Sequence, residues 1–189
     1  MAAPAEKTLK DLTGKWVMNK VLSDSTDDVL TLQGVGWLKR KVIANATVTL
    51  HVKHYHADDG VEHVDIKQTV SPGGFNGTTE DRTLDWTLRP HDDDLFGPLK
   101  GKSRRVKLEE VEIPFLKEGW LPEVVETIEA YASSDTEKSG TSWTANQTWG
   151  FEEIDGVRRY VRHLDFIGPK GQHLQKKLVY DYIGANDLE

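Results

Sequence analysis

From residue 47 onward, apolar and polar residues alternate along most of the chain. In residues 47–56, Val48, Leu50 and Val52 fall on one side of an extended chain, and mostly polar side chains fall on the other. A period of two residues is typical of a β-strand with one buried face. The same pattern predicts strands at residues 14–22, 47–56, 61–70, 77–88, 95–96, 100–108, 143–154, 157–167 and 174–183.

Turn residues separate the predicted strands. Residues 58–60, 72–74, 155–156 and 168–171 are rich in Asp, Gly and Pro, which favour hairpin turns. About nine or ten antiparallel strands joined in this way must close or stack, because an open sheet would leave unpaired edges. We therefore predict an all-β fold, a closed antiparallel meander β-barrel. It would form a single domain over residues 11–189, after a flexible tail at residues 1–10.

Helical signals are confined to two places, of which the first follows the first strand. Residues 23–28 are rich in Ser, Thr and Asp, a typical helix start, and predict a short helix that ends at Leu32. Gly34 and Gly36 interrupt it, and a second helix is predicted over residues 37–46. The pair is expected to form a short helix-turn-helix lid on the barrel.

The second helical signal lies in residues 109–142, a segment that breaks the strand rhythm. Pro122 suits a first helical turn, and the apolar residues after it predict a short amphipathic helix followed by a polar loop. The apolar positions are Val124, Val125, Ile128 and Tyr131. A long insertion between barrel strands is either a lid or ligand loop, or a decorated surface loop, and both interpretations stay open.

Composition narrows the class of protein. The net charge is -7 and the basic residues are dispersed among acids, so no nucleic-acid partner is expected. The chain has no cysteine, which excludes disulfides, thiolate zinc sites and a cysteine nucleophile. The first residues show no secretory signal and no apolar run could span a bilayer, so we expect a cytoplasmic protein without stable membrane insertion, as a monomer or weak homodimer. Three sequons, at Asn45, Asn76 and Asn146, are interpreted as chance matches.

Two polar clusters suggest metal binding only weakly. The four histidines of one predicted hairpin fit either a metal site or a polar outer face, and we favour the outer face. They are His51, His54, His56 and His63. Residues 92–94 are all Asp but lack the spacing of a calcium loop, so they predict a turn. No nucleophile elbow, P-loop or zinc-protease motif occurs, and neither a metal nor a cofactor is expected.

Blocks near both ends of the chain resemble a known family. Residues 12–16 (LTGKW) and 32–41 (LQGVGWLKRK) resemble the start of the intracellular fatty acid-binding proteins, part of the lipocalin-like (calycin) group. Val-Tyr-Asp at residues 179–181 resembles that family's last strand. The resemblance implies a divergent, longer member: a meander barrel capped by a helix-turn-helix, with a ligand cavity inside.

The resemblance also implies a ligand headgroup site, with one departure. In the family, an arginine two residues before the C-terminal tyrosine helps to grip the ligand carboxylate, and here that position is Leu178. If Tyr180 points inward, as the resemblance implies, Lys176 and Leu178 share its face. Lys176 is then a candidate replacement for the arginine. The alternative is that Lys176 lies at the rim in solvent.

Other aromatic and basic residues are candidates for the same pocket. They alternate along predicted strands or lie on the second predicted helix, and they either line a small-molecule pocket or fill the core. The candidates are Arg82, Trp86, Trp149, Tyr160, Arg162 and Trp37.

Two functions fit this architecture. The first is binding of a hydrophobic or amphipathic small molecule inside the barrel, as a lipid or metabolite carrier. The alternative is a cofactor-independent enzyme that uses the pocket to steer a cyclisation, cycloaddition (pericyclase) or isomerisation of a natural-product intermediate. Its hydrogen-bonding candidates are Tyr160, Tyr180, Arg82 and His163. A barrel used only for protein contacts ranks below both.

Overall fold

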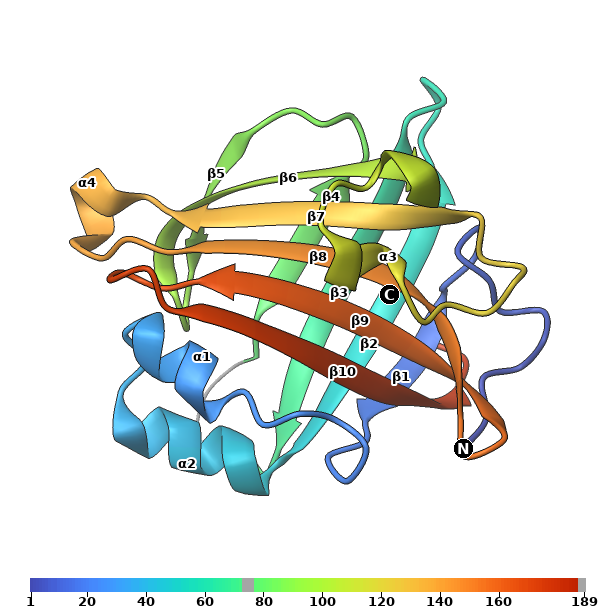
Figure 1. The fold of residues 1–189 in the computed structure, drawn as a ribbon, viewed down its shortest axis with the longest axis horizontal. Coiled ribbons are helices and arrows are strands. Elements are labelled where there is room, and N and C mark those ends of the chain that lie inside the picture. The colour runs from blue at the N-terminus through green and yellow to red at the C-terminus, as the bar shows by residue number, and fades with distance from the viewer. Residues whose placement is uncertain (73–76, 187–189) are drawn as a thin grey trace.

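The computed structural model describes residues 1–72 and 77–186, so most of the turn predicted at residues 72–74, and the sequon residue Asn76, lie outside the described residues. Within the described part, ten strands form one antiparallel sheet in the order β4-β3-β2-β1-β10-β9-β8-β7-β6-β5 (Figure 1). The strands are β1 (Gly14–Met18), β2 (Thr47–His56), β3 (Glu62–Ser71), β4 (Thr79–Thr83), β5 (Arg89–Asp93), β6 (Gly97–Lys107), β7 (Glu126–Ser134), β8 (Thr144–Ile154), β9 (Val157–Ile167) and β10 (His173–Gly184).

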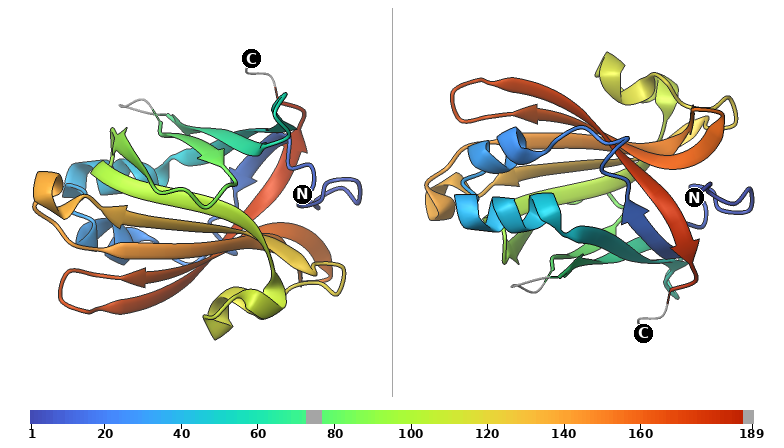
Figure 2. Two further views of the ribbon diagram at one scale, coloured as in Figure 1. Left: turned by 90° about the horizontal axis from the view of Figure 1, so that it is seen from above. Right: turned by 90° about the horizontal axis from the view of Figure 1, so that it is seen from below.

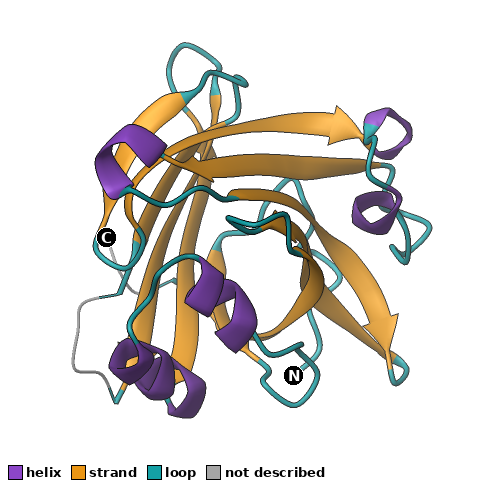
Figure 3. Cartoon of the chain, turned by 60° about the vertical axis from the view of Figure 1, so that its left-hand side comes forward, coloured by secondary structure: helices purple, strands orange, loops and turns teal. Residues whose placement is uncertain are grey.

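The sheet curves into a ring, and the barrel is nearly closed (Figure 3). The edge strands β4 and β5 are not hydrogen-bonded to each other. The segment after β4 bridges the gap: Asp85 pairs with Arg104 of β6, and the Trp86 amide donates a hydrogen bond to the Ser103 carbonyl at 2.8 Å. The predicted all-β meander barrel is confirmed.

The helical lid is confirmed as well. Helices α1 (Asp27–Leu32) and α2 (Trp37–Asn45) follow β1 and lie at one end of the barrel, away from the N-terminus (Figures 1 and 2). The Arg40 guanidinium joins the two helices, because its Nε donates to Asp27 Oδ1 at 2.9 Å and its Nη1 donates to the Val35 carbonyl at 2.9 Å. Within the described residues, no helix combines the length and apolar character needed to cross a bilayer.

The helix predicted after Pro122 is wrong. Glu126–Ser134 instead form strand β7, which pairs with β6 on one side and β8 on the other. Ile128 and Ala130 alternate into the core. The larger apolar residues of the segment happen to follow helical spacing, and the small inward residues of the strand give only a weak alternation. The remaining helical turns are η1 (Leu108–Glu110), α3 (Pro114–Lys117) and α4 (Thr136–Ser139).

Residues 111–121 form a clamp on the outer face of β8 and β9. The His163 ring is stacked between Phe115 and Trp120, with ring centroids 5.0 and 4.0 Å apart. Its Nδ1 lies 2.8 Å from the Phe115 carbonyl oxygen, and its Nε2 pairs with Glu152. This part of the insertion therefore packs on the outside of the barrel and leaves the cavity to other elements (Figure 2).

Other boundaries also differ from the predictions. The strand expected at residues 77–88 is shorter, because β4 ends at Thr83 and Trp86 has a backbone φ of 60°. The pair expected to form a strand at residues 95–96 is a turn, in which Asp93 Oδ1 accepts hydrogen bonds from the amides of Leu95 (2.7 Å) and Phe96 (2.9 Å). The turn predicted at residues 92–94 is therefore displaced, because β5 continues to Asp93.

The N-terminal tail is held against the barrel. Residues 1–10 were expected to be loose, yet Leu9 is buried and the Ala3 amide donates to the Arg158 carbonyl at 2.8 Å. The Arg158 guanidinium in turn donates to the Pro4 carbonyl at 2.9 Å. Backbone hydrogen bonds of this kind cannot be predicted from a short polar sequence, so the flexible tail was expected instead.

His54 does not belong to a polar outer face. Its side chain is almost fully buried, its Nε2 lies 2.8 Å from Glu62 Oε1, and its Nδ1 accepts from the Leu12 amide at 3.2 Å. Burial would raise the pKa of the Glu62 carboxyl, but hydrogen bonds from His54 and Arg105 outweigh burial and hold that pKa at about 2. The network links β2, β3 and β6 to the segment that precedes β1.

Candidate functional site

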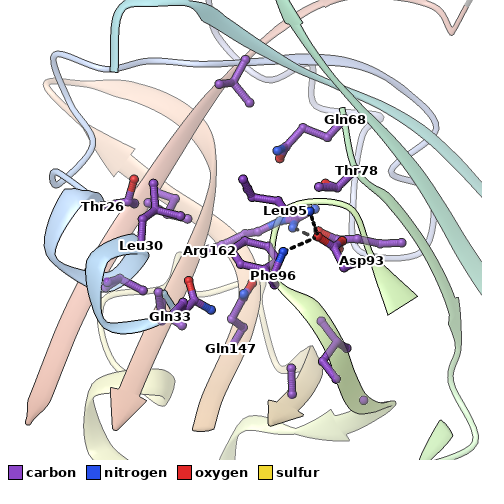
Figure 4. A pocket seen from close by; sticks show the side chains of 18 of the residues that line it. Thr26, Leu30, Gln33, Gln68, Thr78, Asp93, Leu95, Phe96, Gln147 and Arg162 are labelled. Carbon is purple, nitrogen blue, oxygen red and sulfur yellow. Dashed lines mark hydrogen bonds and ion pairs between the residues drawn. The ribbon is translucent and has the colours of Figure 1, made fainter. Parts of the chain in front are cut away.

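A cavity of about 690 Å³ lies inside the barrel and reaches α1 and α2. Its wall next to α1 contains an apolar cluster, in which Val29 of α1 packs with residues from the strands facing it. The cavity-lining strand and turn members of that cluster are Phe96, Leu99, Ala132, Trp143 and Leu164. Figure 4 shows the pocket between α1, which carries Leu30 and Gln33, and the strands, which carry Gln147 and Arg162.

The deeper part of the cavity holds a buried arginine. Arg162 of β9 is only 3% exposed, and its guanidinium lies over the Trp149 ring at 4.1 Å from the centroid. Its Nε donates to the Tyr160 hydroxyl at 2.9 Å, and its Nη1 lies 3.7 Å from Glu80 Oε2. Its Nη2 has no hydrogen-bond partner within the described residues.

A second arginine and one carboxylate complete the polar group. Arg82 Nε and Nη2 lie 2.9 and 2.8 Å from Glu80 Oε2, and Arg82 Nη1 lies 3.1 Å from Ser103 Oγ. Burial would raise the pKa of Glu80, but the positive charges of Arg82 and Arg162 outweigh it and lower the pKa. The carboxylate is therefore ionised and shared between two guanidinium groups.

The tyrosines beside this group stay neutral. Burial raises the pKa of both Tyr160 and Tyr180 above the ordinary phenol value. Burial alone would lower the pKa of Arg162, but its neighbours outweigh burial, and the pKa stays above the ordinary value. Two guanidinium groups and one carboxylate then leave a net charge of +1 at the deep end of the cavity.

Four of the residues predicted for the site line the cavity: Arg82, Arg162, Leu178 and Tyr180. Trp149 and Tyr160 are fully buried behind the Arg162 guanidinium and act as its packing partners. The cation absent from position 178 is supplied by the next strand, because Leu178 of β10 is paired with Arg162 of β9.

Three other candidates lie away from the cavity. Lys176 Nζ forms an ion pair with Asp28 Oδ2 of α1 at 2.7 Å. Trp86 is absent from the cavity wall, since it lies in the irregular segment after β4, where Lys102 Nζ is 4.1 Å from its ring centroid. Trp37 is 62% exposed at the start of α2.

Sequence reasoning missed Glu80 and most of the apolar wall. Glu80 lies two residues before Arg82 on β4, so strand periodicity alone would have put its carboxylate on the same face. The apolar residues of the wall are not among the nine candidates, although residues 109–142, which contain Ala132, were considered as a ligand loop. These wall residues are Val29, Phe96, Leu99, Ala132, Trp143 and Leu164. Within the described residues, no group of three or more His, Asp or Glu side chains is arranged to hold a metal ion.

Comparison with known proteins places the chain in a family. No family model matches it. A probable pericyclase, scpY of Mollisia scopiformis, is 33% identical over 187 residues, which cover 97% of this chain and 95% of the relative. The chain belongs to the family of this pericyclase. A second member, the pericyclase pydY of an Acremonium species, is 29% identical and is matched over 97% of this chain and 98% of its own length.

Comparison with solved structures shows that this chain has the fatty acid-binding protein fold. A Schistosoma mansoni fatty acid-binding protein in complex with arachidonic acid has a TM-score of 0.55 at 10% identity, covering 94% of this chain and 99% of that one. A REP1-NXSQ fatty acid transporter mutant has a TM-score of 0.54 at 16% identity, covering 92% and 98%. These likenesses confirm the fold predicted by resemblance.

The ion pair of Lys176 gives a first prediction about the lid. Replacing Lys176 with Met removes a link between β10 and α1 but leaves the cavity wall intact, so the dye 1-anilinonaphthalene-8-sulfonate should leave the protein several-fold faster. The stability cost should stay below about 1 kcal/mol, as for other exposed pairs. Stopped-flow displacement measures the rate.

Salt is the control for the Lys176 experiment. At about 1 M salt the Debye length is roughly 3 Å, so the wild-type dissociation rate should rise toward that of the Lys176→Met variant. An unchanged dissociation rate in the variant would mean that the ion pair does not hold the lid.

Proposed function

We propose that this chain is a cofactor-independent pericyclase that folds a linear, conjugated polyene inside its barrel for ring closure. The observation that carries the proposal is the 690 Å³ cavity, with an apolar wall at the helix end and a fixed polar group at the deep end. Family membership supports it, because two relatives are named pericyclases over nearly the full length of this chain.

The physical basis is restriction of the substrate's conformations. A flexible polyene in water samples many shapes, and only a few bring the reacting carbons together. Contact with the apolar wall favours compact shapes, since burying hydrocarbon stabilises a bound ligand by about 25 cal/mol per Å². A barrier lowered by about 3 kcal/mol would accelerate closure roughly 10²-fold.

A carrier function is the second candidate. It is favoured by the net charge of +1 beside the cavity and by the fold, which includes a neighbour solved with arachidonic acid. A carrier would bind a long-chain acid tightly and leave the rate of any ring closure unchanged.

The test uses a panel of synthetic polyenes, each with a conjugated diene tethered to an electron-poor alkene. Product formation and the ratio of stereoisomers are followed by chiral chromatography with native protein, heat-unfolded protein and buffer. We expect native protein to accelerate closure of at least one polyene and to give a single stereoisomer. Rates and ratios equal to buffer, together with displacement of a fluorescent fatty acid by oleate, would support the carrier instead.

We further propose a cytoplasmic location and a monomeric or weakly dimeric state, both predicted from the sequence. Subcellular fractionation checks the first, and sedimentation velocity over a concentration series checks the second. A stable higher oligomer would contradict the expected state.

A further inference from the structure

The unpaired donor of Arg162 is the least explained polar atom of the cavity. Nη2 is buried and has no hydrogen-bond partner within the described residues, although the residue lines the cavity. Leaving a buried donor unsatisfied costs about 1 to 3 kcal/mol, and more for a charged group. A ligand oxygen placed in the cavity would remove that cost.

The guanidinium is held in one orientation. Trp149 lies under its plane at 4.1 Å, and the Tyr160 hydroxyl accepts from Nε at 2.9 Å. Both partners are fully buried, on β8 and β9. A donor fixed before the substrate arrives needs no reorganisation during the reaction, which is the condition for effective electrostatic catalysis.

Arg82, the second arginine of the cavity, differs from Arg162 in its hydrogen bonds. The hydrogen bonds of the Arg82 guanidinium go to Glu80 and Ser103, at 2.8 to 3.1 Å, and the group also lies 5.4 Å from the Trp149 ring centroid. Glu80 forms an ion pair with Arg162 Nη1 at 3.7 Å, which is too long for a hydrogen bond, so it uses none of the N–H donors of Arg162. The acceptor that Arg162 suits is an oxygen on which negative charge develops.

We propose that Arg162 is a catalytic hydrogen-bond donor, and that the substrate is a polyene whose electron-poor alkene is conjugated to a carbonyl group. The carbonyl oxygen binds at the Arg162 guanidinium, and the hydrocarbon extends past Leu164 toward Val29 and the helix end. This inference rests on the proposed pericyclase function and names its substrate class.

The chemistry needs no co-reactant. In a [4+2] closure, three π bonds of the diene and alkene become two new σ bonds and one new π bond, and no proton or electron leaves the substrate. The hydrogen bond withdraws electron density from the alkene through the carbonyl, which lowers the barrier. The proton of this hydrogen bond stays on the Arg162 guanidinium throughout.

The experiment compares two synthetic polyenes of equal length. One carries an amide carbonyl conjugated to the alkene, and the other has a methylene group in its place. Arg162→Met should lower kcat for the carbonyl polyene by about 10²-fold, the usual effect of losing one such donor, and change KM much less. Arg162→Lys should recover part of the rate, and closure of the methylene polyene should not depend on Arg162.

Arg104→Met is the matched control. Arg104 lies on the outer side of β6, where its Nε donates to Glu129 at 2.7 Å, and it is absent from the cavity wall. This variant should keep the wild-type kcat for both polyenes. Thermal unfolding of all variants separates loss of catalysis from loss of fold.

A second measurement uses wild-type protein and does not depend on any variant folding. The probe is a carbonyl-labelled (¹³C) amide polyene in which the diene is saturated, so that it binds without reacting. Infrared difference spectra should show a downshift of its carbonyl stretch on binding, relative to water. A carbonyl stretch shifted upward, as in an apolar site, would overturn the proposal.

The outcomes separate the two proposals. If wild-type protein accelerates neither polyene, the pericyclase function fails. If wild-type protein accelerates both and Arg162→Met slows neither or both equally, the pericyclase function stands and the role of Arg162 is wrong. If Arg162→Met weakens only the binding of oleate, Arg162 is a carboxylate site and not a catalytic donor.

Discussion

Replacing Glu80 with Gln is expected to lower the free energy of unfolding by about 2 to 4 kcal/mol at pH 7, in the range found when one partner of a buried ion pair is removed. The carboxylate is the counter-ion of both Arg82 and Arg162. Without it, the two guanidinium groups beside the Trp149 ring lose their shared counter-ion. The cavity wall leaves Glu80 about 25% accessible, which places the effect below that of a fully dry pair.

The Glu80 effect should depend on pH in a defined direction. The folded protein lowers the pKa of Glu80 below its ordinary value. A depressed carboxyl pKa contributes stability that is present above the unfolded pKa and is lost as pH falls through the folded value. The difference between wild type and Glu80→Gln should therefore be full at pH 7 and shrink in acid, as measured by urea unfolding across a pH series.

A second glutamate–arginine pair provides the control for Glu80. Glu123 lies 3.5 Å from Arg158 and its side chain is 57% exposed, outside the cavity wall. Glu123→Gln should cost about 0 to 1 kcal/mol. Equal costs for the two variants would show that the cavity is as well solvated as the surface, and would remove the electrostatic argument for Arg162.

Most of the fold was predictable because alternation is a local property. On β2, Leu50 and Val52 face inward as their spacing predicts, and the paired strands continue the pattern. The alternation failed where neighbours decide the structure. Strand β7 forms because β6 and β8 pair with it on both sides. The spacing of Val124 and Ile128 does not reveal this pairing.

The site was predictable only in part, since it is assembled from distant strands. Periodicity placed Arg82, Arg162 and Tyr180 on candidate inward faces. Register decided the rest: Glu80 of β4 approaches Arg162 of β9, although about 80 residues separate them. Lys176 is predicted on the same face of β10 as Tyr180, but it lies near α1 and forms an ion pair with Asp28. Alternation along a strand predicts which side of the sheet a residue occupies. Its position along the barrel axis depends on how the strands pair in the folded protein.

Replacing Ala132 with Trp is expected to abolish turnover of both test polyenes, by about 10²-fold or more. Ala132 of β7 lines the cavity and packs in the apolar cluster with Trp143 and Leu164. An indole in place of its methyl group occupies the space where the hydrocarbon would lie, and a barrier raised by about 3 kcal/mol gives the stated loss. Turnover is measured by the same chromatographic assay.

Tyr131→Trp is the matched control, because Tyr131 alternates with Ala132 along β7 and is absent from the cavity wall. It introduces the same residue one position away and should leave turnover unchanged. Overpacking usually costs about 1 to 3 kcal/mol, and the empty space beside Ala132 should keep the cost at the low end. Normal turnover by a stably folded Ala132→Trp variant would mean that the polyene does not bind against this wall.

The Ala132 and Arg162 variants together separate shape from electrostatics. Loss of cavity space should affect both polyenes, because each must fold against the apolar wall. Loss of the donor should affect only the polyene that carries a carbonyl group. If Ala132→Trp removes the activity toward both polyenes and Arg162→Met toward one, the wall and the guanidinium make separable contributions. Their free energies should then add in the double variant, since the two groups contact different parts of the substrate.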